Sequence, residues 1–395
     1  MKWRAFLRAA AVVVVLAAVA QVQAGVMYTV TDLGSLAGWG AVPTAINDLG
    51  QVVGYSFQPE GTRAFRTAPN QPINPATDDL GTLAGKTYSE AYGINNLGQV
   101  VGWSGSGAPG VDGHTFRTGP NQPINPETDD LGTLGGSSSS ACGVNDSGQV
   151  VGRAKLPGDA ITHAFRTGPN RAINPATDDL GTFGGSWSAA YGINASGQVV
   201  GTSSLSDGAQ HGFRTKPTGP IDPIGDDLGP VGGWSEGIAV NGSGQVAGSF
   251  RGVASADEHL FRTAPNRPID PSVDDLGIIG GIPRVLGMND GGDVVGWFFA
   301  PPDYDHQRAF VVLGSRLFDL NDLVEPAPGL VLGLAYDINN LGQIVVSGNY
   351  NGRVVAYRLD PVPEPSMVAL IAVGLSMTLG RRPKSAGAQT GFRRV

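Results

Sequence analysis

Three short sequence marks recur seven times along residues 28–358, and this repetition limits the chain to folds built from equivalent units. The first mark is an Asp-Leu pair, the second is an Asn that opens a run close to Asn-x-x-Gly-Gln-Val-Val-Gly, and the third is an aromatic residue that Arg usually follows. The Asp residues are Asp32, Asp79, Asp130, Asp179, Asp227, Asp275 and Asp319; the Asn residues are Asn47, Asn95, Asn145, Asn194, Asn241, Asn289 and Asn339; the aromatic residues are Phe65, Phe116, Phe165, Phe213, Phe261, Phe310 and Tyr357. Residues 25–360 therefore divide into seven units of about 48 residues, a length found in propeller blades and in solenoid repeats.

Each unit contains four stretches with the pattern of short β-strands. In the second unit, residues 92–95 and 99–102 are joined by a turn with Asn and Gly, which is typical of a β-hairpin. A third strand is expected around residues 116–118 and a fourth around residues 130–133. The 60 Gly and 28 Pro residues, with charged residues at only 15%, leave few strong helix formers. The sequence therefore predicts an all-β protein.

The two ends of the repeat region complement each other. Residues 28–34 form a fourth strand with no preceding partner, and the last unit, residues 337–358, ends after its third strand. If the N-terminal strand completes the last unit, the ring closes and no strand edge stays unpaired. We therefore predict a seven-bladed β-propeller closed by the N-terminal strand. An open β-solenoid is the alternative.

The connections between strands form a constant and a variable set. In the first five units that have all marks, the Asp of the fourth strand follows the aromatic by 14 residues. The path from the second to the third strand varies between 11 and 14 residues, and the path from the fourth strand to the next Asn varies between 14 and 20. Variable loops on a rigid scaffold are where recognition usually occurs. The face that carries these variable loops is our candidate binding face.

Aromatic residues interrupt the repeat on this face. Trp39, Tyr88, Trp187 and Trp234 occupy one loop position in four units, just before the first strand. Exposed flat rings suit the apolar faces of sugars or peptide side chains, so these four residues are candidate binding residues. The alternative is that the rings fold back onto their own blades.

Two acids are expected at the mouth of the central channel. Glu90 and Glu236 stand five residues before the repeated Asn, on the innermost strand, and are also candidate binding residues. A glycosidase would need two carboxyl groups roughly 5 to 9.5 Å apart, whereas these acids lie three blades apart. Arg284 in the neighbouring unit is the expected partner of Glu236. The sequence therefore indicates no catalytic residues.

The remaining polar marks favour structural roles. His114, His163, His211 and His259 each stand two residues before a repeated Phe, so each is expected to pack beside that ring and not to bind metal. Arg66 and Asp78, with their equivalents, are expected to form an ion pair between adjacent strands. The chain has one cysteine, Cys142, which excludes an intramolecular disulfide. No metal and no cofactor is predicted.

Both termini have the pattern of targeting segments. Residues 1–24 begin with basic residues and continue with an apolar run, which predicts a signal peptide cleaved between Ala24 and Gly25. In the C-terminal segment 361–395, the run Pro363-Glu364-Pro365 precedes an apolar stretch and the basic pair Arg381 and Arg382. A short transmembrane helix is expected over residues 367–380, with the basic pair on the cytoplasmic side.

These features resemble two bacterial families. The repeats, with a His-x-Phe run such as 163–165, resemble extracellular HAF repeats, and the tail resembles the PEP-CTERM sorting signal. The resemblance implies export, transient anchoring in the inner membrane, and processing near Pro363–Pro365 by an exosortase-type transpeptidase. Delivery to the cell envelope or the extracellular matrix would follow. The chain departs from the sorting signal by continuing from residue 383 to residue 395 beyond the basic pair.

The net charge of the chain limits the classes of molecule that it is expected to bind. The formal charge is −8, and because the two terminal segments carry +3 and +4, residues 25–360 carry −15. Such a surface argues against nucleic acid as a partner. We expect a non-enzymatic surface or matrix scaffold that binds polysaccharide or a surface protein. The alternatives are a polysaccharide hydrolase or lyase on a propeller scaffold, and a purely structural matrix component.

Overall fold

The structure is a computed structural model that describes residues 27–107, 112–229, 233–252, 257–277, 279–302 and 306–363. The predicted signal peptide with its cleavage site at Ala24 and Gly25, and the predicted tail from Glu364 onward, including the helix over 367–380 and the pair Arg381 and Arg382, lie outside these residues. Within the described residues, no helix is long and apolar enough to cross a membrane. The described chain is all-β apart from one short 3-10 helix, η1 (Leu320–Asp322), which confirms the predicted fold class.

Each repeat unit forms one group of antiparallel strands. The groups are β2 (Ala41–Ile46), β3 (Val52–Gln58) and β4 (Gly61–Arg66); β5 (Tyr88–Ile94), β6 (Val100–Gly105) and β7 (His114–Arg117); β8 (Ser139–Val144), β9 (Val150–Lys155), β10 (Thr162–Arg166) and β11 (Asp179–Gly181); β12 (Gly184–Ile193), β13 (Val199–Leu205) and β14 (Gln210–Arg214); β15 (Trp234–Val240), β16 (Val246–Arg251), β17 (His259–Arg262) and β18 (Asp275–Gly277); β19 (Gly281–Met288), β20 (Val294–Phe299), β21 (Gln307–Leu313) and β22 (Arg316–Asp319); and β23 (Leu330–Ile338), β24 (Ile344–Tyr350), β25 (Arg353–Pro361) and β1 (Tyr28–Gly34). A single parallel pair, Thr162 with Trp187, joins the third group to the fourth.

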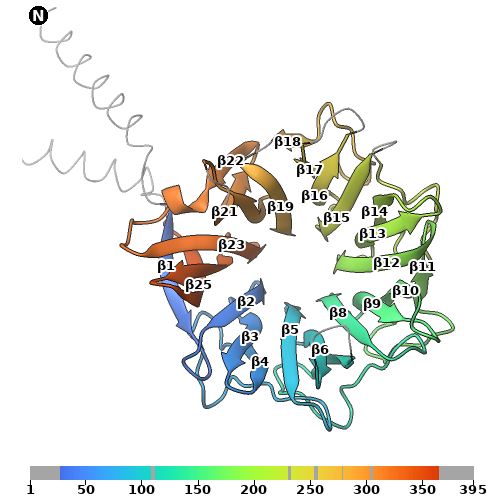
Figure 1. Ribbon diagram of the computed structural model, residues 1–395, viewed down its shortest axis with the longest axis horizontal. Coiled ribbons are helices and arrows are strands. Elements are labelled where there is room, and N and C mark those ends of the chain that lie inside the picture. The colour runs from blue at the N-terminus through green and yellow to red at the C-terminus, as the bar shows by residue number, and fades with distance from the viewer. Residues whose placement is uncertain are drawn as a thin grey trace, which may run out of the picture.

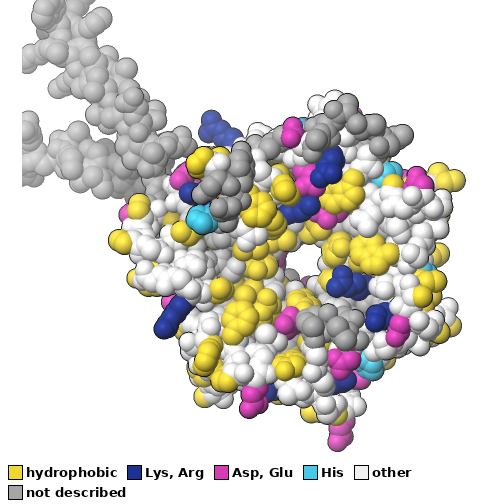
Figure 2. Space-filling view, viewed as in Figure 1, with side chains coloured by type: hydrophobic (Ala, Val, Ile, Leu, Met, Phe, Trp, Pro, Cys, Tyr) yellow, Lys and Arg dark blue, Asp and Glu magenta, His cyan; other side chains and the backbone are white. Residues whose placement is uncertain are grey.

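These groups are arranged like the blades of a propeller. Figure 1 shows them around a common centre, with β2, β5, β8, β12, β15, β19 and β23 innermost. Figure 2 shows the opening at this centre, with hydrophobic and charged side chains around it. The fourth strand has three residues in β11 and β18 and four in β22, whereas β1 has seven. In the second unit the expected strand at 130–133 is reduced to one bridge, Phe116 with Asp130.

The repeated Asn and Gly residues explain the hairpin between the first and second strands. Asn47 Oδ1 accepts hydrogen bonds from the backbone N–H groups of Leu49 and Gln51, which holds the turn. Gly50 has a φ of +75°, a conformation that favours glycine. In the following strand, a Cβ on Gly54 would lie 2.0 Å from the carbonyl oxygen of Val42, so only glycine fits there.

The hydrophobic core lies between neighbouring units. The repeated Phe side chains are fully buried, and Phe116 packs with Val53 and Ala64 of the preceding unit. At the junction of the two ends, Phe65 and Ala41 of the first unit pack with Val345 and Ala356 of the last. Each sheet therefore buries its faces against two neighbours, which favours a ring over separate domains.

The first strand pairs with the last strand, as the sequence predicted. β1 runs antiparallel to β25, with Val30 opposite Leu359 and Thr31 opposite Arg358. The strand order is β1-β25-β24-β23, so the N-terminal strand is the outermost strand of the last unit. The edge of β25 is covered as a result.

Four histidines contact the Asp of the fourth strand, an arrangement that the sequence did not predict. His211 Nδ1 lies 3.0 Å from Asp227, and His114, His163 and His259 make the same contact with the Asp of their own fourth strand. Arg308 takes the same position in the sixth unit and pairs with Asp319 at 2.5 Å. The repeated basic residue two positions before the aromatic thus fastens the short fourth strand to the third.

The expected ion pair between Arg66 and Asp78, both of which the structure describes, is not formed. Arg66 Nη1 donates instead to the carbonyl oxygens of Gly98 and Gln122 in the next unit, at 3.3 and 3.0 Å. Asp78 accepts the backbone N–H of Asn74 at 2.8 Å and is buried. The arginine after the aromatic therefore joins neighbouring units, a relation that no reading within one unit reveals.

Candidate functional site

Trp39 is the most exposed of the four candidate aromatic residues. It is 66% exposed and lies in the connection between β1 and β2. Together with Phe57, Arg353 and Val354 it lines a hollow of about 510 Å³ between the first unit and the last. Gly38 and Gly352 complete the lining, and no atom lies within 4 Å of where a Cβ would stand on either. The hollow offers an aromatic face and a guanidinium to solvent.

The other three candidates lie in strands, not in a loop as the sequence analysis expected. Tyr88 and Trp234 begin β5 and β15, Trp187 lies within β12, and all three are partly buried. A Cβ on Gly61 would lie 1.7 Å from Cε1 of Tyr88, so the Tyr88 ring covers the preceding unit. Partial burial within a strand favours packing for the three residues, and the contact with Gly61 shows it directly for Tyr88.

Trp234 also belongs to a charged cluster. Arg284 Cζ lies 5.1 Å from the centroid of the Trp234 ring, within the range of a cation–π contact. Arg284 Nε lies 3.8 Å from Glu236, which confirms the predicted partnership, and Arg284 Nη1 lies 2.7 Å from Glu258. Arg251 contacts the other oxygen of Glu258 at 2.8 Å. Two acids and two bases therefore neutralise each other in this cluster.

The two candidate acids have separate partners. Burial raises the pKa of Glu236, Arg284 opposes this effect, and Glu258 adds to it. Glu90 accepts a hydrogen bond of 2.5 Å from the hydroxyl of Tyr92 and one of 3.0 Å from Thr62. The charged groups that shift the pKa of Glu236 do not include Glu90. Glu90 and Glu236 are therefore held by different side chains and do not form a pair.

The opposite ends of the innermost strands form a second concave site, which the sequence analysis did not identify. A cavity of about 280 Å³ opens where the hairpin turns meet around the channel. Its floor is an apolar belt of the residues that precede each repeated Asn: Ile46, Ile94, Val144, Ile193, Val240, Met288 and Ile338. Its rim is formed by the repeated Asn residues and the residues that follow them. We call this cavity the turn-side mouth.

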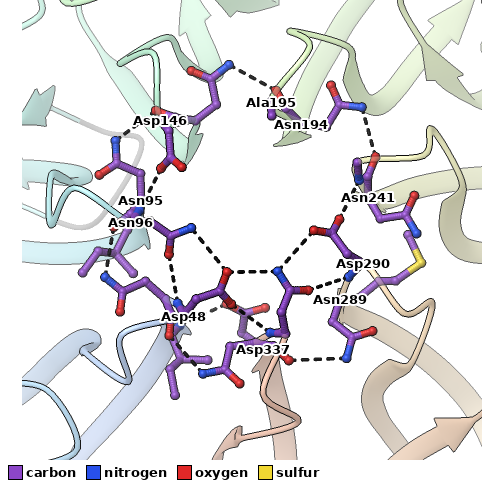
Figure 3. A pocket seen from close by; sticks show the side chains of 18 of the residues that line it. Asp48, Asn95, Asn96, Asp146, Asn194, Ala195, Asn241, Asn289, Asp290 and Asp337 are labelled. Atoms are coloured by element: carbon purple, nitrogen blue, oxygen red, sulfur yellow. Dashed lines mark hydrogen bonds between the residues drawn. The ribbon is translucent and has the colours of Figure 1, made fainter.

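The repeated Asn residues connect the units around this mouth (Figure 3). The side-chain Nδ2 of Asn47 donates to the backbone oxygen of Asn95 at 3.0 Å, and Asn95 donates to Asn145 at 2.9 Å. The same bond leads from Asn145 to Asn194, from Asn194 to Asn241, from Asn289 to Asn339 and from Asn339 to Asn47. In these six units the Asn therefore serves twice, holding its own turn and fastening the next unit.

Comparisons with known proteins do not indicate a function for this chain. No family model matches the sequence, and no curated protein does. Similar solved structures include a Trypanosoma rangeli sialidase in complex with sialic acid, with 8% identity over 89% of this chain and a TM-score of 0.44. A mutant of AofleA from Arthrobotrys oligospora has 8% identity over 84% of this chain and 86% of that chain, with a TM-score of 0.33. The present chain spans 61% of the length of the sialidase. These likenesses carry no functional argument.

Asp337 departs from the repeat inside the turn-side mouth. The other units have Gly or Ala two residues before the Asn, whereas the last unit has this aspartate. Its carboxylate accepts the backbone N–H groups of Ile46 at 3.0 Å and Ile338 at 2.9 Å, so it joins the last unit to the first. Burial raises the pKa of Asp337 to about 7 despite these two hydrogen bonds. In the described part of the chain, no group of three or more His, Cys, Asp or Glu is placed to hold a metal ion.

Proposed function

We propose that the chain is an exported, non-enzymatic, seven-bladed β-propeller, closed by its N-terminal strand, that binds glycan. The observation that carries the proposal is the Trp39 hollow, where a largely exposed indole stands beside Phe57 and Arg353. A flat apolar ring stacks on the C–H face of a sugar, and a guanidinium donates hydrogen bonds to sugar oxygens. The hollow lies on the face with variable loops, where recognition is expected.

Two features support binding without cleavage. Glu236 is paired with Arg284, and Glu90 is held by Tyr92 and Thr62, so the two candidate acids have different partners and do not act as a pair. Glycoside hydrolysis in most families needs an acid and a second carboxylate at a set separation. A hydrolase or lyase is therefore the weaker alternative.

The proposal also covers where the protein is exported and how it is anchored. A signal peptide over residues 1–24 would direct export, and the tail over 361–395 would hold the chain briefly in the inner membrane. An exosortase-type transpeptidase would then process the tail near Pro363, and the propeller would reach the cell envelope or matrix. A matrix component with no ligand remains the structural alternative.

A glycan array tests this function. The full chain should bind one class of polysaccharide without converting it, and Trp39→Ala should weaken binding about tenfold, because one stacked ring is worth roughly 1 kcal/mol or more. Ile224→Ala is the matched control, since Ile224 is 92% exposed and lies outside the hollow. Turnover of the bound sugar would favour the enzyme, and binding of surface proteins alone would favour a protein partner.

A further inference from the structure

A second ring of hydrogen bonds surrounds the turn-side mouth, formed by the residue after each repeated Asn. In this ring a backbone N–H donates to the side-chain oxygen of the equivalent residue in the next unit. The bonds run from Gly242 to Asp290 at 2.7 Å, from Asp290 to Asn340 at 2.8 Å, from Asn340 to Asp48 at 2.9 Å, from Asp48 to Asn96 at 2.9 Å and from Asn96 to Asp146 at 2.8 Å. Figure 3 shows Asp48, Asn96, Asp146 and Asp290 of this ring around the cavity.

The ring is interrupted where the chain has Ala195 and Gly242. Ala195 has no side-chain oxygen to accept the backbone N–H of Asp146, and Gly242 has none to accept the backbone N–H of Ala195. Among the described residues, these two N–H groups have no other hydrogen-bond partner. Both residues line the cavity. A Cβ on Gly242 would lie 3.0 Å from Asp290 Oδ1, so the close approach of Asp290 itself leaves little room for a side chain there. We call the part of the rim between Asp146 and Asp290 the gap.

Two residues elsewhere in the ring show which chemical group satisfies such a position. Asn340 Oδ1 accepts a backbone N–H, while its Nδ2 donates to Asp48 at 2.9 Å and to Asp290 at 3.2 Å. Asn96 repeats the arrangement and donates to Asp48 at 3.3 Å. A neutral amide thus pairs its oxygen with an N–H group and its N–H with a neighbouring carboxylate.

The gap presents the same combination of groups to a ligand. It has two N–H donors, from Asp146 and Ala195, and a carboxylate at each end. Asp146 Oδ1 accepts the N–H of Asn96, while the two oxygens of Asp290 accept from Gly242 and Asn340. An anion would be repelled by these carboxylates, and a simple cation would leave the N–H donors without an acceptor. Beneath the gap, Ile193 and Val240 supply an apolar floor. An amide that carries a methyl group meets all three requirements.

We propose that the gap binds the acetamido group of an N-acetylated amino sugar. The acetamido oxygen accepts from the N–H groups of Asp146 or Ala195, its N–H donates to a flanking carboxylate, and its methyl group lies on Ile193 and Val240. A cavity of about 280 Å³ suits one sugar residue rather than a long polymer segment. The site is at the opposite end of the innermost strands from the Trp39 hollow, so it does not depend on that hollow.

Calorimetry of the full chain tests the proposal with two matched tetramers, β-1,4-linked N-acetylglucosamine and β-1,4-linked glucose, which differ in the group at carbon 2. The acetylated tetramer should bind at least about tenfold more tightly, since the glucose tetramer lacks the two amide hydrogen bonds. Ala195→Asn should lower that affinity by a similar factor, because the new carboxamide would accept the N–H of Asp146 and fill the Ala195 side of the gap. Leu97→Asn, in an equivalent turn but outside the cavity lining, should leave it unchanged.

Equal affinity for the two tetramers, or an Ala195→Asn variant that binds as before, would overturn the proposal. Tighter binding of the tripeptide Gly-Asn-Gly than of the acetylated tetramer would overturn the sugar assignment. Trp39→Ala should not change binding of the acetylated tetramer. A loss in that variant would place the contact at the Trp39 hollow and contradict a site in the turn-side mouth.

Discussion

Asn339 Nδ2 donates a hydrogen bond of 3.0 Å to the backbone oxygen of Asn47, although 292 positions separate the two residues. Both side chains are buried, and the bond continues the ladder that joins successive units. The junction between the chain ends therefore uses the same contact as the junctions within the chain. This junction adds one contact of its own, because the Asp337 carboxylate accepts the backbone N–H of Ile46 at 3.0 Å.

The ladder of Asn side-chain hydrogen bonds predicts that two equivalent asparagines contribute differently to the free energy of unfolding. Asn339→Ala should lower the free energy of unfolding by roughly 1 kcal/mol more than Asn241→Ala, because it also removes the bond to Asn47. In the described residues, Asn241 Nδ2 donates to Gln245 within its own turn and to no neighbouring unit. Urea denaturation measures both values, and equal losses would show that the bond between units contributes nothing.

The pairing of β1 with β25 predicts that the N-terminal strand is essential for stability. Deleting residues 25–34 should lower the melting temperature and promote aggregation, because the edge of β25 would be exposed. Leu33, which is fully buried, would also leave the core at the junction. Calorimetry and gel filtration check this, and an unchanged melting curve would contradict closure by β1.

Asp337 predicts a pH dependence of stability. Its pKa is raised from 3.8 to about 7 in the folded state, so its contribution is most favourable below about pH 4 and declines as pH rises toward 7. Asp337→Ala, which installs a residue found in other units, should reduce the loss of stability between pH 4 and pH 8 by roughly 2 to 4 kcal/mol.

The contact between His211 and Asp227 also depends on pH, so the same experiment needs a control for it. The hydrogen bond that His211 donates to Asp227 raises the pKa of His211, so this pair also loses strength as pH rises above 6.5. The difference between wild type and Asp337→Ala isolates the aspartate, since both proteins keep the pairs. Parallel pH profiles for the two proteins would show that Asp337 does not titrate in this range.

Trp39 and Trp234 should respond differently to removal of the indole. Trp234→Ala should lower the free energy of unfolding by about 1 to 3 kcal/mol, because Arg284 loses its ring partner and a partly buried side chain is removed. Trp39→Ala should change stability by less than about 0.5 kcal/mol, since the ring is largely exposed. Thermal denaturation of both variants measures these stability changes. A strongly destabilised Trp39→Ala variant would favour a packing role for Trp39 as well.

The tail can be tested in cells. Replacing Pro363, Glu364 and Pro365 with alanine should leave the full-length precursor in the membrane fraction, because the apolar segment stays while the recognition sequence is lost. Fractionation followed by immunoblotting measures the ratio of precursor to released protein. Release at the wild-type level would contradict the sorting assignment.

Much of the fold follows from local sequence patterns. Asn47 and Gly50 specify a turn through bonds that span four residues, and alternating burial along strands such as β5 needs no distant partner. The pairing of β1 with β25 also followed from the sequence, because the missing strand of the last unit and the surplus strand at the start are visible in the repeat. The position of Arg284 beside Glu236 followed from its place in the next unit.

Contacts between units were not predictable in the same way. The His–Asp pairs were missed because the short fourth strand returns by a long connection, and Arg66 was assigned to its own unit although it reaches carbonyl groups of the next. Three of the four aromatic candidates were placed in a loop because their strands begin earlier than the repeat suggests. The Ala195 and Gly242 interruption was visible in the sequence, but its meaning depends on a ring that exists only when the units meet.

The sequence by itself thus determined the unit, the number of its repetitions and the way its ends complement each other, because these depend on turns and strand periodicity within about 48 residues. The tertiary structure decided which polar groups meet across units, since the Asn47, Asp48 and Arg66 contacts lie between residues brought together by the ring. It also decided which rings are exposed. Burial depends on the neighbouring unit, so Trp39 faces solvent while Trp234 is covered by Arg284.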